Sequence, residues 1–362
     1  MRLQHLAPIN EGECAARPAA FWLRRLSMAG FAAAALWPAL AWSETSNGSN
    51  GSAEASPTQA IDPRNWLMRA YEAARVRNYE GTLVSSESGS IAVWHVAHYF
   101  EGDQQYERVD VLSGEAMTVL RHNDVVHKLW PQSREAEVEQ RDVRSGSLSL
   151  PSAVEQRIID SYDLQPMGIR RIAGFEAEVV LLRARDALRF SQRWWAERQT
   201  GLLLRADIVD PSGQVLDWST FSEITIGVKP RPDVVTGRLR HLEGYRLRRT
   251  AYLPTSLNNE GWQVSGAVPP GFKQVQCAKR SLDPAAGPEA PVVLQSIFSD
   301  GLTHVSLFVE PFDPKRHQGE VVSSIGATHT LMTRHEDQWV TVMGDVPFET
   351  LKRFAAALER KR

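Results

Sequence analysis

Cysteine is almost absent from this chain of 362 residues, which has only Cys14 and Cys277. We expect Cys14 to leave with an N-terminal segment, so Cys277 would have no partner for an intramolecular disulfide. A protein of this size without disulfides depends on its hydrophobic core. Its apolar content of 43% is typical of a globular protein with such a core.

A surplus of positive charge is also lacking, since the formal net charge is −2. Nucleic-acid-binding proteins usually carry a basic footprint, so we expect no nucleic-acid partner. The chain contains no glycine-rich phosphate loop, no dinucleotide fingerprint and no nucleophile elbow in a suitable context. We therefore expect no catalytic residues, no cofactor and no enzyme activity.

Four histidines lie close together in the sequence as candidate metal ligands: His95, His98, His122 and His127. However, His95 and His98 are three residues apart in an expected strand, where side chains alternate between the two faces. They would point to opposite faces and could not bind one metal ion together, so we expect no metal site.

No apolar run reaches the length of a transmembrane helix, which needs about 20 residues. The apolar run Leu26–Leu40 follows Arg17, Arg24 and Arg25 and ends in Ala39-Leu40-Ala41. This pattern predicts a signal peptide over residues 1–41, with an uncleaved N-terminal anchor as the alternative. Without residues 1–41 the net charge becomes −4, because four Arg and two Glu leave with them. An exported protein without disulfides fits the bacterial periplasm.

Residues 42–60 are rich in Ser, Gly and Asn and predict a disordered leader. A first α+β domain is expected over residues 61–228. It would hold a long, mostly antiparallel sheet and two helices, near 62–77 and 152–162. Its clearest part is a set of three antiparallel strands, Arg189–Ala196, Leu202–Val209 and Val215–Ile224. The last two are joined by Asp210-Pro211-Ser212-Gly213, whose Pro and Gly suit a chain reversal.

Two prolines without apolar periodicity predict a linker over residues 229–237, followed by a smaller second domain over residues 238–362. This domain is also expected to be α+β, with antiparallel strands. Asp300-Gly301 predicts a two-residue hairpin turn between Val292–Ser299 and Leu302–Val309. A final helix is expected from Pro347 onwards.

The first domain carries many large apolar side chains on its expected strands. We predict that eight of them line one concave surface that accepts acyl chains: Trp94, Phe100, Leu181, Phe190, Trp194, Leu204, Ile208 and Trp218. The alternative is an ordinary core packed beneath the two helices.

A run of arginines opens the second domain, namely Arg238, Arg240, Arg246, Arg248 and Arg249. Such a run is usually a solvated face. The alternative, which we adopt as the partner-binding prediction, is a site for carboxylates or phosphates of a partner.

Several short stretches resemble the MucB/RseB family: Tyr79–Thr82, Arg193–Trp195, Thr200–Arg205, Phe221–Ile224, Phe298–Leu302, Ser306–Glu310 and Val342–Pro347. The resemblance covers about residues 61–360, with the stretches in the family's order. It implies a large N-terminal antiparallel half-barrel sheet with helices, similar to LolA and LppX, and a smaller C-terminal antiparallel α+β domain.

The resemblance also implies a function. Such proteins bind the periplasmic region of an inner-membrane anti-sigma factor (MucA/RseA-like) and shield it from site-1 proteolysis. They thereby restrain the sigma-E (AlgU-like) factor of the envelope stress response. They release the anti-sigma factor when acyl chains of lipopolysaccharide or lipoprotein bind.

Two rivals remain at this point. A periplasmic lipid or lipoprotein carrier would need only the first domain, and a hydrolase lacks a nucleophile–base constellation. A homodimer is possible.

Export provides a first testable prediction. We expect cleavage after Ala41, because the arginines, the short apolar run and the Ala-x-Ala ending together form a signal-peptidase site. Edman sequencing of the protein from a periplasmic extract should start at Trp42. Recovery of Met1 from a membrane fraction would contradict it.

Overall fold

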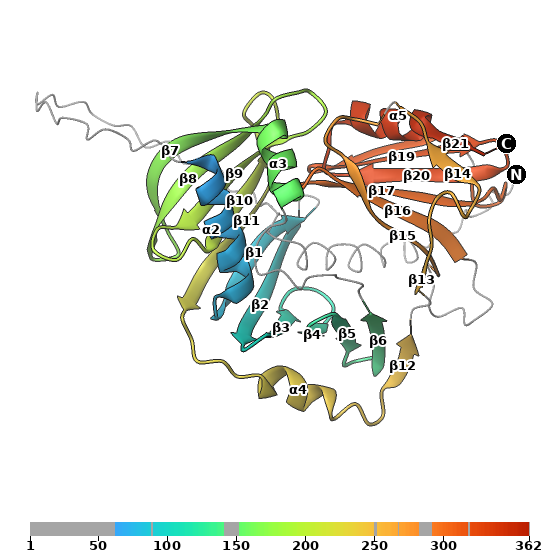
Figure 1. The fold of residues 1–362 in the computed structure, drawn as a ribbon. Coiled ribbons are helices and arrows are strands. Elements are labelled where there is room, and N and C mark those ends of the chain that lie inside the picture. Colours follow the sequence, from blue (N-terminus) through green and yellow to red (C-terminus); the bar gives the residue numbers. More distant parts are fainter. Residues whose placement is uncertain are drawn as a thin grey trace, which may run out of the picture.

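The computed structural model describes residues 62–87, 90–140, 152–249, 252–266, 268–281, 292–317 and 319–361. The predicted signal peptide (1–41) and leader (42–60) lie outside these residues. The described chain forms two units, a large curved sheet and a smaller sheet domain beside it (Figure 1). None of the described helices is both long and apolar enough to cross a bilayer.

The larger sheet has twelve strands among the described residues, in the order β12-β6-β5-β4-β3-β2-β1-β11-β10-β9-β8-β7. Their bounds are β1 (Tyr79–Glu87), β2 (Ser90–Glu101), β3 (Gln104–Val111), β4 (Thr118–His122), β5 (Val125–Trp130), β6 (Glu135–Gln140), β7 (Tyr162–Ile172), β8 (Phe175–Ala184), β9 (Ser191–Glu197), β10 (Leu203–Val209), β11 (Val215–Ile226) and β12 (Arg246–Arg249). All neighbours pair antiparallel except β12 with β6. The sheet bends strongly and stays open between β7 and β12 (Figure 1). The predicted long antiparallel sheet is confirmed.

Two helices, α2 (Pro63–Val76) and α3 (Ser152–Ser161), cover one face of this sheet, which we call the inner face. Asp62 caps α2 through a hydrogen bond of 3.0 Å from the Arg64 backbone N–H to its carboxylate. Trp66, Leu67 and Ala70 of α2 are buried against the strands. Both predicted helices are confirmed.

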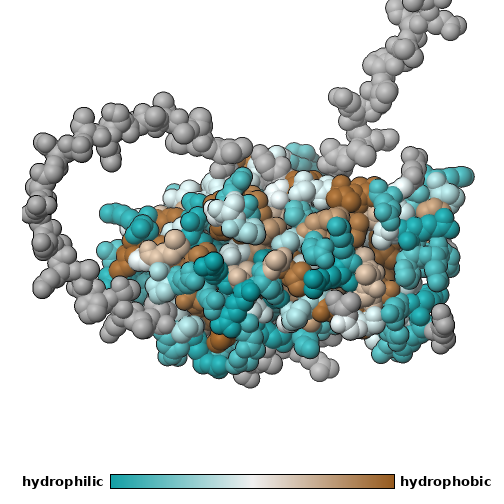
Figure 2. Space-filling view, turned by 90° about the horizontal axis from the view of Figure 1, so that it is seen from above, coloured by the Kyte–Doolittle hydropathy of each residue, from teal (hydrophilic) through white to brown (hydrophobic). Residues whose placement is uncertain are grey.

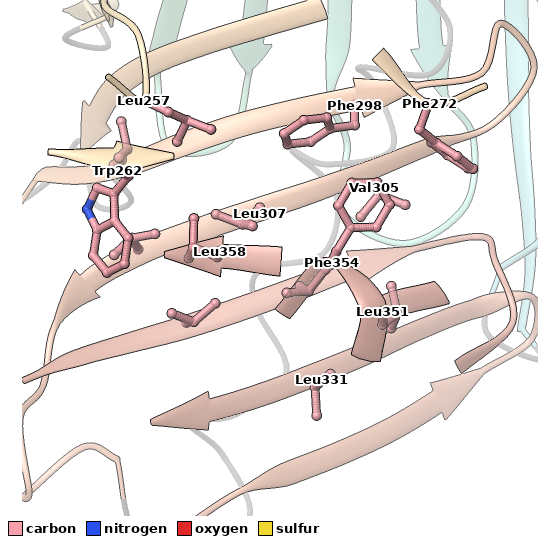
Figure 3. Packing of buried hydrophobic residues seen from close by; sticks show 14 of the residues in the cluster. Leu257, Trp262, Phe272, Phe298, Val305, Leu307, Leu331, Leu351, Phe354 and Leu358 are labelled. Atoms are coloured by element: carbon pink, nitrogen blue, oxygen red, sulfur yellow. The ribbon is translucent and has the colours of Figure 1, made fainter. Parts of the chain in front are cut away.

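The smaller domain has a seven-stranded antiparallel sheet in the order β13-β15-β16-β17-β20-β19-β18. Its strands are β13 (Tyr252–Pro254), β15 (Lys273–Ser281), β16 (Val292–Ser299), β17 (His304–Pro311), β18 (Val321–Ile325), β19 (Thr328–His335) and β20 (Gln338–Gly344). A separate pair joins β14 (Trp262–Val264) to β21 (Leu358–Arg360). Helix α5 (Phe348–Ala357) packs Leu351 and Phe354 on the sheet, where Phe354 contacts Phe298 and Phe272 (Figure 3).

The predicted linker and the start of the second domain need correction. Helix α4 (Asp233–Leu239) follows Pro232 and buries Val235 on the face of the large sheet opposite α2, which we call the outer face. Strand β12 then extends the large sheet beyond β6. Residues 229–249 are therefore a belt across the first domain rather than a free linker and the start of the second. Apolar side chains of the belt, such as Val235 and Leu239, decide this by packing on the sheet.

The predicted two-residue turn at Asp300-Gly301 is wrong. Strand β16 ends at Ser299 and β17 begins at His304, so four residues connect them. The Asp300 carboxylate accepts backbone hydrogen bonds of 2.9 Å from both Leu302 and Thr303, which stabilises the longer loop.

Asp300 also joins the two domains. It is fully buried, and its Oδ2 accepts hydrogen bonds from the Tyr162 hydroxyl (3.0 Å) and from Arg189 (2.8 Å) of the first domain. Arg189, only 2% exposed, donates a further bond of 2.6 Å to the Pro270 carbonyl. This buried charged pair has its hydrogen bonds satisfied on both sides of the interface.

A second contact links the domains at Asp217 of β11. Its Oδ2 accepts a hydrogen bond of 2.7 Å from the Ala327 backbone N–H in the turn before β19. Gly326 has a positive φ of 58°, and an added Cβ there would lie 2.5 Å from the Asp217 carboxylate. A larger residue here would adopt an unfavourable backbone conformation and would displace the Asp217 carboxylate from its present position.

Removal of the Asp300 carboxylate should weaken the domain interface. We expect Asp300→Ala to lower the free energy of unfolding by roughly 3–5 kcal/mol, because Arg189 loses a fully buried anion. Denaturant titration followed by circular dichroism measures this.

The matched control is Asp163→Ala, which removes the half-exposed partner of Arg185 at 2.7 Å. That change should cost less than about 1 kcal/mol. Equal losses in the two variants would contradict a special role of the buried pair.

Candidate functional site

The inner face of the large sheet carries four of the eight predicted lipid-binding residues. Trp194 pairs with Ala206 and with Val180 across neighbouring strands, so these three share one face. The same row continues through Ser219 and Ser85 to β2, which places Trp94 and Phe100 on this face. Ile208 lies two residues beyond Ala206 in the same strand, so its side chain is also on the inner face.

Leu181 and Trp218 lie on the outer face instead. The register aligns Leu181 with Arg193, Arg193 with Asp207, and Asp207 with Trp218. Because cross-strand partners share a face, this row is opposite to the row of Trp194. A single surface made of all eight residues is therefore wrong, since the relative register of three strands was not fixed by their separate alternation.

Several of the remaining residues are core. Trp194 packs on Trp66 of α2, with ring centroids 6.2 Å apart. Phe190 and Ile208 are buried against Ala327 of the second domain. Leu204 is buried in the cluster that contains Phe221.

The half-buried part of the inner face lies over β2, β3 and β5. Trp94 pairs with Val111, and Trp130 packs in the same apolar cluster. These side chains are the candidate apolar site. Val111 and Trp130 were missed as site residues, although the alternation of Val111 with Asp110 was a signal for Val111.

Viewed from above, the surface mixes hydrophilic and hydrophobic residues, and the hydrophobic ones gather in several separate areas (Figure 2). Side-chain composition on that side therefore does not single out one large apolar patch.

The predicted partner-binding arginines divide into two groups. Arg238 and Arg240, at the end of α4, are exposed and form no ion pair among the described residues. Arg246 and Arg248, in β12, both contact Glu135 of β6. The side chain of Arg249 lies outside the described residues. Of the four arginines whose side chains are described, Arg238 and Arg240 thus present uncompensated charge.

Arg231 anchors the belt to the large sheet. It donates hydrogen bonds of 2.6 Å to both carboxylate oxygens of Glu80, which also accepts one from the Tyr99 hydroxyl. Burial alone would raise the pKa of Glu80, but the bonds from Tyr99 and Arg231 outweigh it and lower that pKa. Burial and the Glu80 carboxylate raise the pKa of Tyr99 to about 12.

Known proteins match both domains of this chain in order. The sequence profile of the MucB/RseB N-terminal domain matches residues 62–239, and that of the MucB/RseB C-terminal domain matches residues 256–359. The chain belongs to the MucB/RseB family.

Curated members of the family are sigma-factor regulatory proteins. The "sigma factor AlgU regulatory protein MucB" of Pseudomonas aeruginosa is 29% identical over 331 residues, which cover 85% of this chain and 94% of that protein. The "sigma-E factor regulatory protein RseB" of Haemophilus influenzae is 22% identical over 76% of this chain and 84% of its own length. The family is thus one of regulatory proteins rather than of enzymes.

A solved structure titled as the complex of P. aeruginosa MucA and MucB has the same fold. It aligns with a TM-score of 0.63 and 25% identity, over 83% of this chain and all of that one. A second structure, titled as MucB in complex with MucA(peri), aligns with a TM-score of 0.61 over the same shares.

One stretch that resembles the MucB/RseB family has a clear structural role. Gly81, in the Tyr79–Thr82 stretch of β1, faces β11 so closely that an added Cβ would lie 2.5 Å from the Glu223 carbonyl oxygen. Glycine at this position lets the two central strands of the sheet approach each other.

The anchor at Glu80 should be visible in an acid titration. Its lowered folded pKa means that its stabilising contribution is complete above the unfolded pKa and is lost as the pH falls through the folded pKa. We expect Arg231→Gln to raise the pKa of Glu80, so that this loss begins at a higher pH. Carbon-13 NMR of the Glu80 carboxyl measures the shift.

Arg198→Gln is the matched control, since Arg198 pairs with the exposed Glu176 at 3.1 Å. It should leave the titration of Glu80 unchanged. A Glu80 titration that is identical in Arg231→Gln and in the unaltered protein would disprove the anchor.

Proposed function

We propose that this protein is a periplasmic regulator that binds the periplasmic region of an inner-membrane anti-sigma factor (MucA/RseA-like). By covering that region it protects the anti-sigma factor from site-1 proteolysis and restrains the envelope-stress sigma factor. The observation that carries the proposal is the two-domain match to a MucB chain that was crystallised with MucA.

Release by a lipidic signal is the second part of the proposal. Trp94, Val111 and Trp130 supply half-buried apolar surface on the inner face, which suits acyl chains of lipopolysaccharide or lipoprotein. Ile208 of the same curved sheet and Phe190, which precedes β9, pack against Ala327 of the second domain. A change in the sheet on lipid binding can therefore act on the second domain through these contacts.

A lipid or lipoprotein carrier is the alternative, favoured by the same apolar inner face. The buried interface around Asp300 argues against it, because a simple shuttle has no need for a second domain held this firmly. A pull-down from membrane extract separates the two. An inner-membrane anti-sigma factor supports the regulator, and outer-membrane lipoproteins alone support the carrier.

A proteolysis assay tests the regulator directly. The mature protein should slow cleavage of its anti-sigma factor by the site-1 protease, and lipid A or a diacyl lipopeptide should restore cleavage. We expect Trp94→Arg to retain protection but to lose the response to lipid, because a charge replaces the apolar surface. The readout is the half-life of the anti-sigma factor on gels.

Ile91→Arg is the control, since Ile91 lies in the same strand but is 54% exposed and on the other face. It should behave like the unaltered protein. Unchanged cleavage in the presence of the protein would refute the regulatory proposal. A normal lipid response of Trp94→Arg would refute the placement of the lipid site.

A further inference from the structure

The outer face of the large sheet also carries a group of charged and aromatic residues that the belt does not cover. At its centre, Asp207 of β10 has a fully buried carboxylate between two arginines. Its Oδ2 accepts hydrogen bonds from Arg193 of β9 (2.6 and 3.2 Å), and its Oδ1 accepts one of 2.8 Å from Arg205. One carboxylate thus holds two guanidinium groups in place.

Two tryptophans contact these guanidinium groups. The ring centroid of Trp195 is 5.1 Å from the Arg193 guanidinium carbon and 4.9 Å from that of Arg205. Arg205 also lies over Trp218, at 5.0 Å. We call these four residues, Arg193, Trp195, Arg205 and Trp218, the Trp–Arg patch. Stacking on aromatic rings restricts the arginines, so less freedom is lost when they bind a ligand.

The patch has an excess of positive charge. Two guanidinium groups share one carboxylate, and each arginine side chain remains about a quarter exposed, at 26% and 27%. Nη1 of Arg193 and both terminal nitrogens of Arg205 donate no hydrogen bond to another described residue. Arg183, on the same face of neighbouring β8, is exposed and forms no ion pair within the described ranges.

We propose that the Trp–Arg patch docks an acidic segment of a protein partner, with a carboxylate of the partner bound by the free edges of Arg193 and Arg205. Guanidinium edges bind planar carboxylates in a forked geometry, and the excess charge selects an anion. Trp and Arg on an exposed sheet face are also the residues that dominate protein–protein interfaces. The inference rests on the proposed function, and the partner segment is the periplasmic region of the anti-sigma factor.

This site is separate from the apolar inner face. Arg193 and Trp195 point to the opposite side of β9 from Trp194, which packs under α2. Lipid at Trp94, Val111 and Trp130 on the inner face and an acidic peptide at β9 and β10 on the outer face can therefore be bound by the same sheet without competing for the same atoms.

The test uses the full mature protein and the labelled periplasmic region of its anti-sigma factor, measured by fluorescence anisotropy at low and high salt. The main variant combines Arg193→Gln, Asp207→Asn and Arg205→Gln, which removes both cations together with their buried anion. We expect its Kd to rise by about tenfold at low salt and by less at high salt, because charge pairs in an interface are screened.

A second variant protects the test against misfolding of the first. Arg183→Glu alters an exposed residue with no ion pair in the described structure, and it should weaken binding by about threefold at low salt. The control is Arg353→Glu, a half-exposed residue of α5 in the other domain, which should bind as the unaltered protein does. A peptide with its Asp and Glu changed to Asn and Gln should bind the triple variant and the unaltered protein equally.

Several results would overturn the inference. If the unaltered protein binds the peptide but the triple variant and Arg183→Glu bind equally well, the patch is not the docking site. If the triple variant loses binding only to phosphatidylglycerol vesicles, the ligand is a lipid headgroup and not a peptide. If the unaltered protein binds no anti-sigma peptide at all, the proposed function fails and the docking inference falls with it.

Discussion

The buried pair of Arg189 and Asp300 is the interaction on which the arrangement of the two domains depends. Burial of two charges costs free energy, and the cost is offset only when every donor and acceptor is satisfied. Here Tyr162, Asp186 and the Pro270 carbonyl complete the set around Arg189 and Asp300. Such a network has few alternative geometries, so it favours one orientation of the small domain against the large sheet. Any rearrangement of the domains has to separate these groups and solvate them again.

The belt of residues 229–249 shows how a second constraint acts on the large sheet. Arg231 is held by Glu80, Val235 is buried, and β12 adds a parallel edge strand. The belt therefore covers the outer face over β3 to β6 and leaves β9 to β11 uncovered by it. One part of the outer face is thus buried beneath the belt. In the other part, Trp and Arg side chains remain accessible.

Three consecutive residues of strand β9 contribute side chains to both faces of the sheet. Trp194 points inward and packs on Trp66, whereas Arg193 and Trp195 point outward and form cation–π contacts. The alternation of side chains along a strand allows this, and the register with β8 and β10 decides which neighbours each residue meets. The aromatic content of this stretch is therefore shared between core and surface, and it does not all belong to one lipid surface.

The sequence alone determined much of this protein. Local signals predicted α2 from Asp62 and Pro63, the strands around Asp210–Gly213, and the family from stretches in both domains, because caps, turns and alternation act over a few residues. It did not determine which face each strand presents to its neighbours, so Leu181 and Trp218 were grouped with Trp194. Nor did it show that the belt packs on the first domain, or that Asp300 bonds to Tyr162 and Arg189 across more than 100 residues. These features depend on register and on contacts between distant segments, and only the tertiary structure brings such segments together.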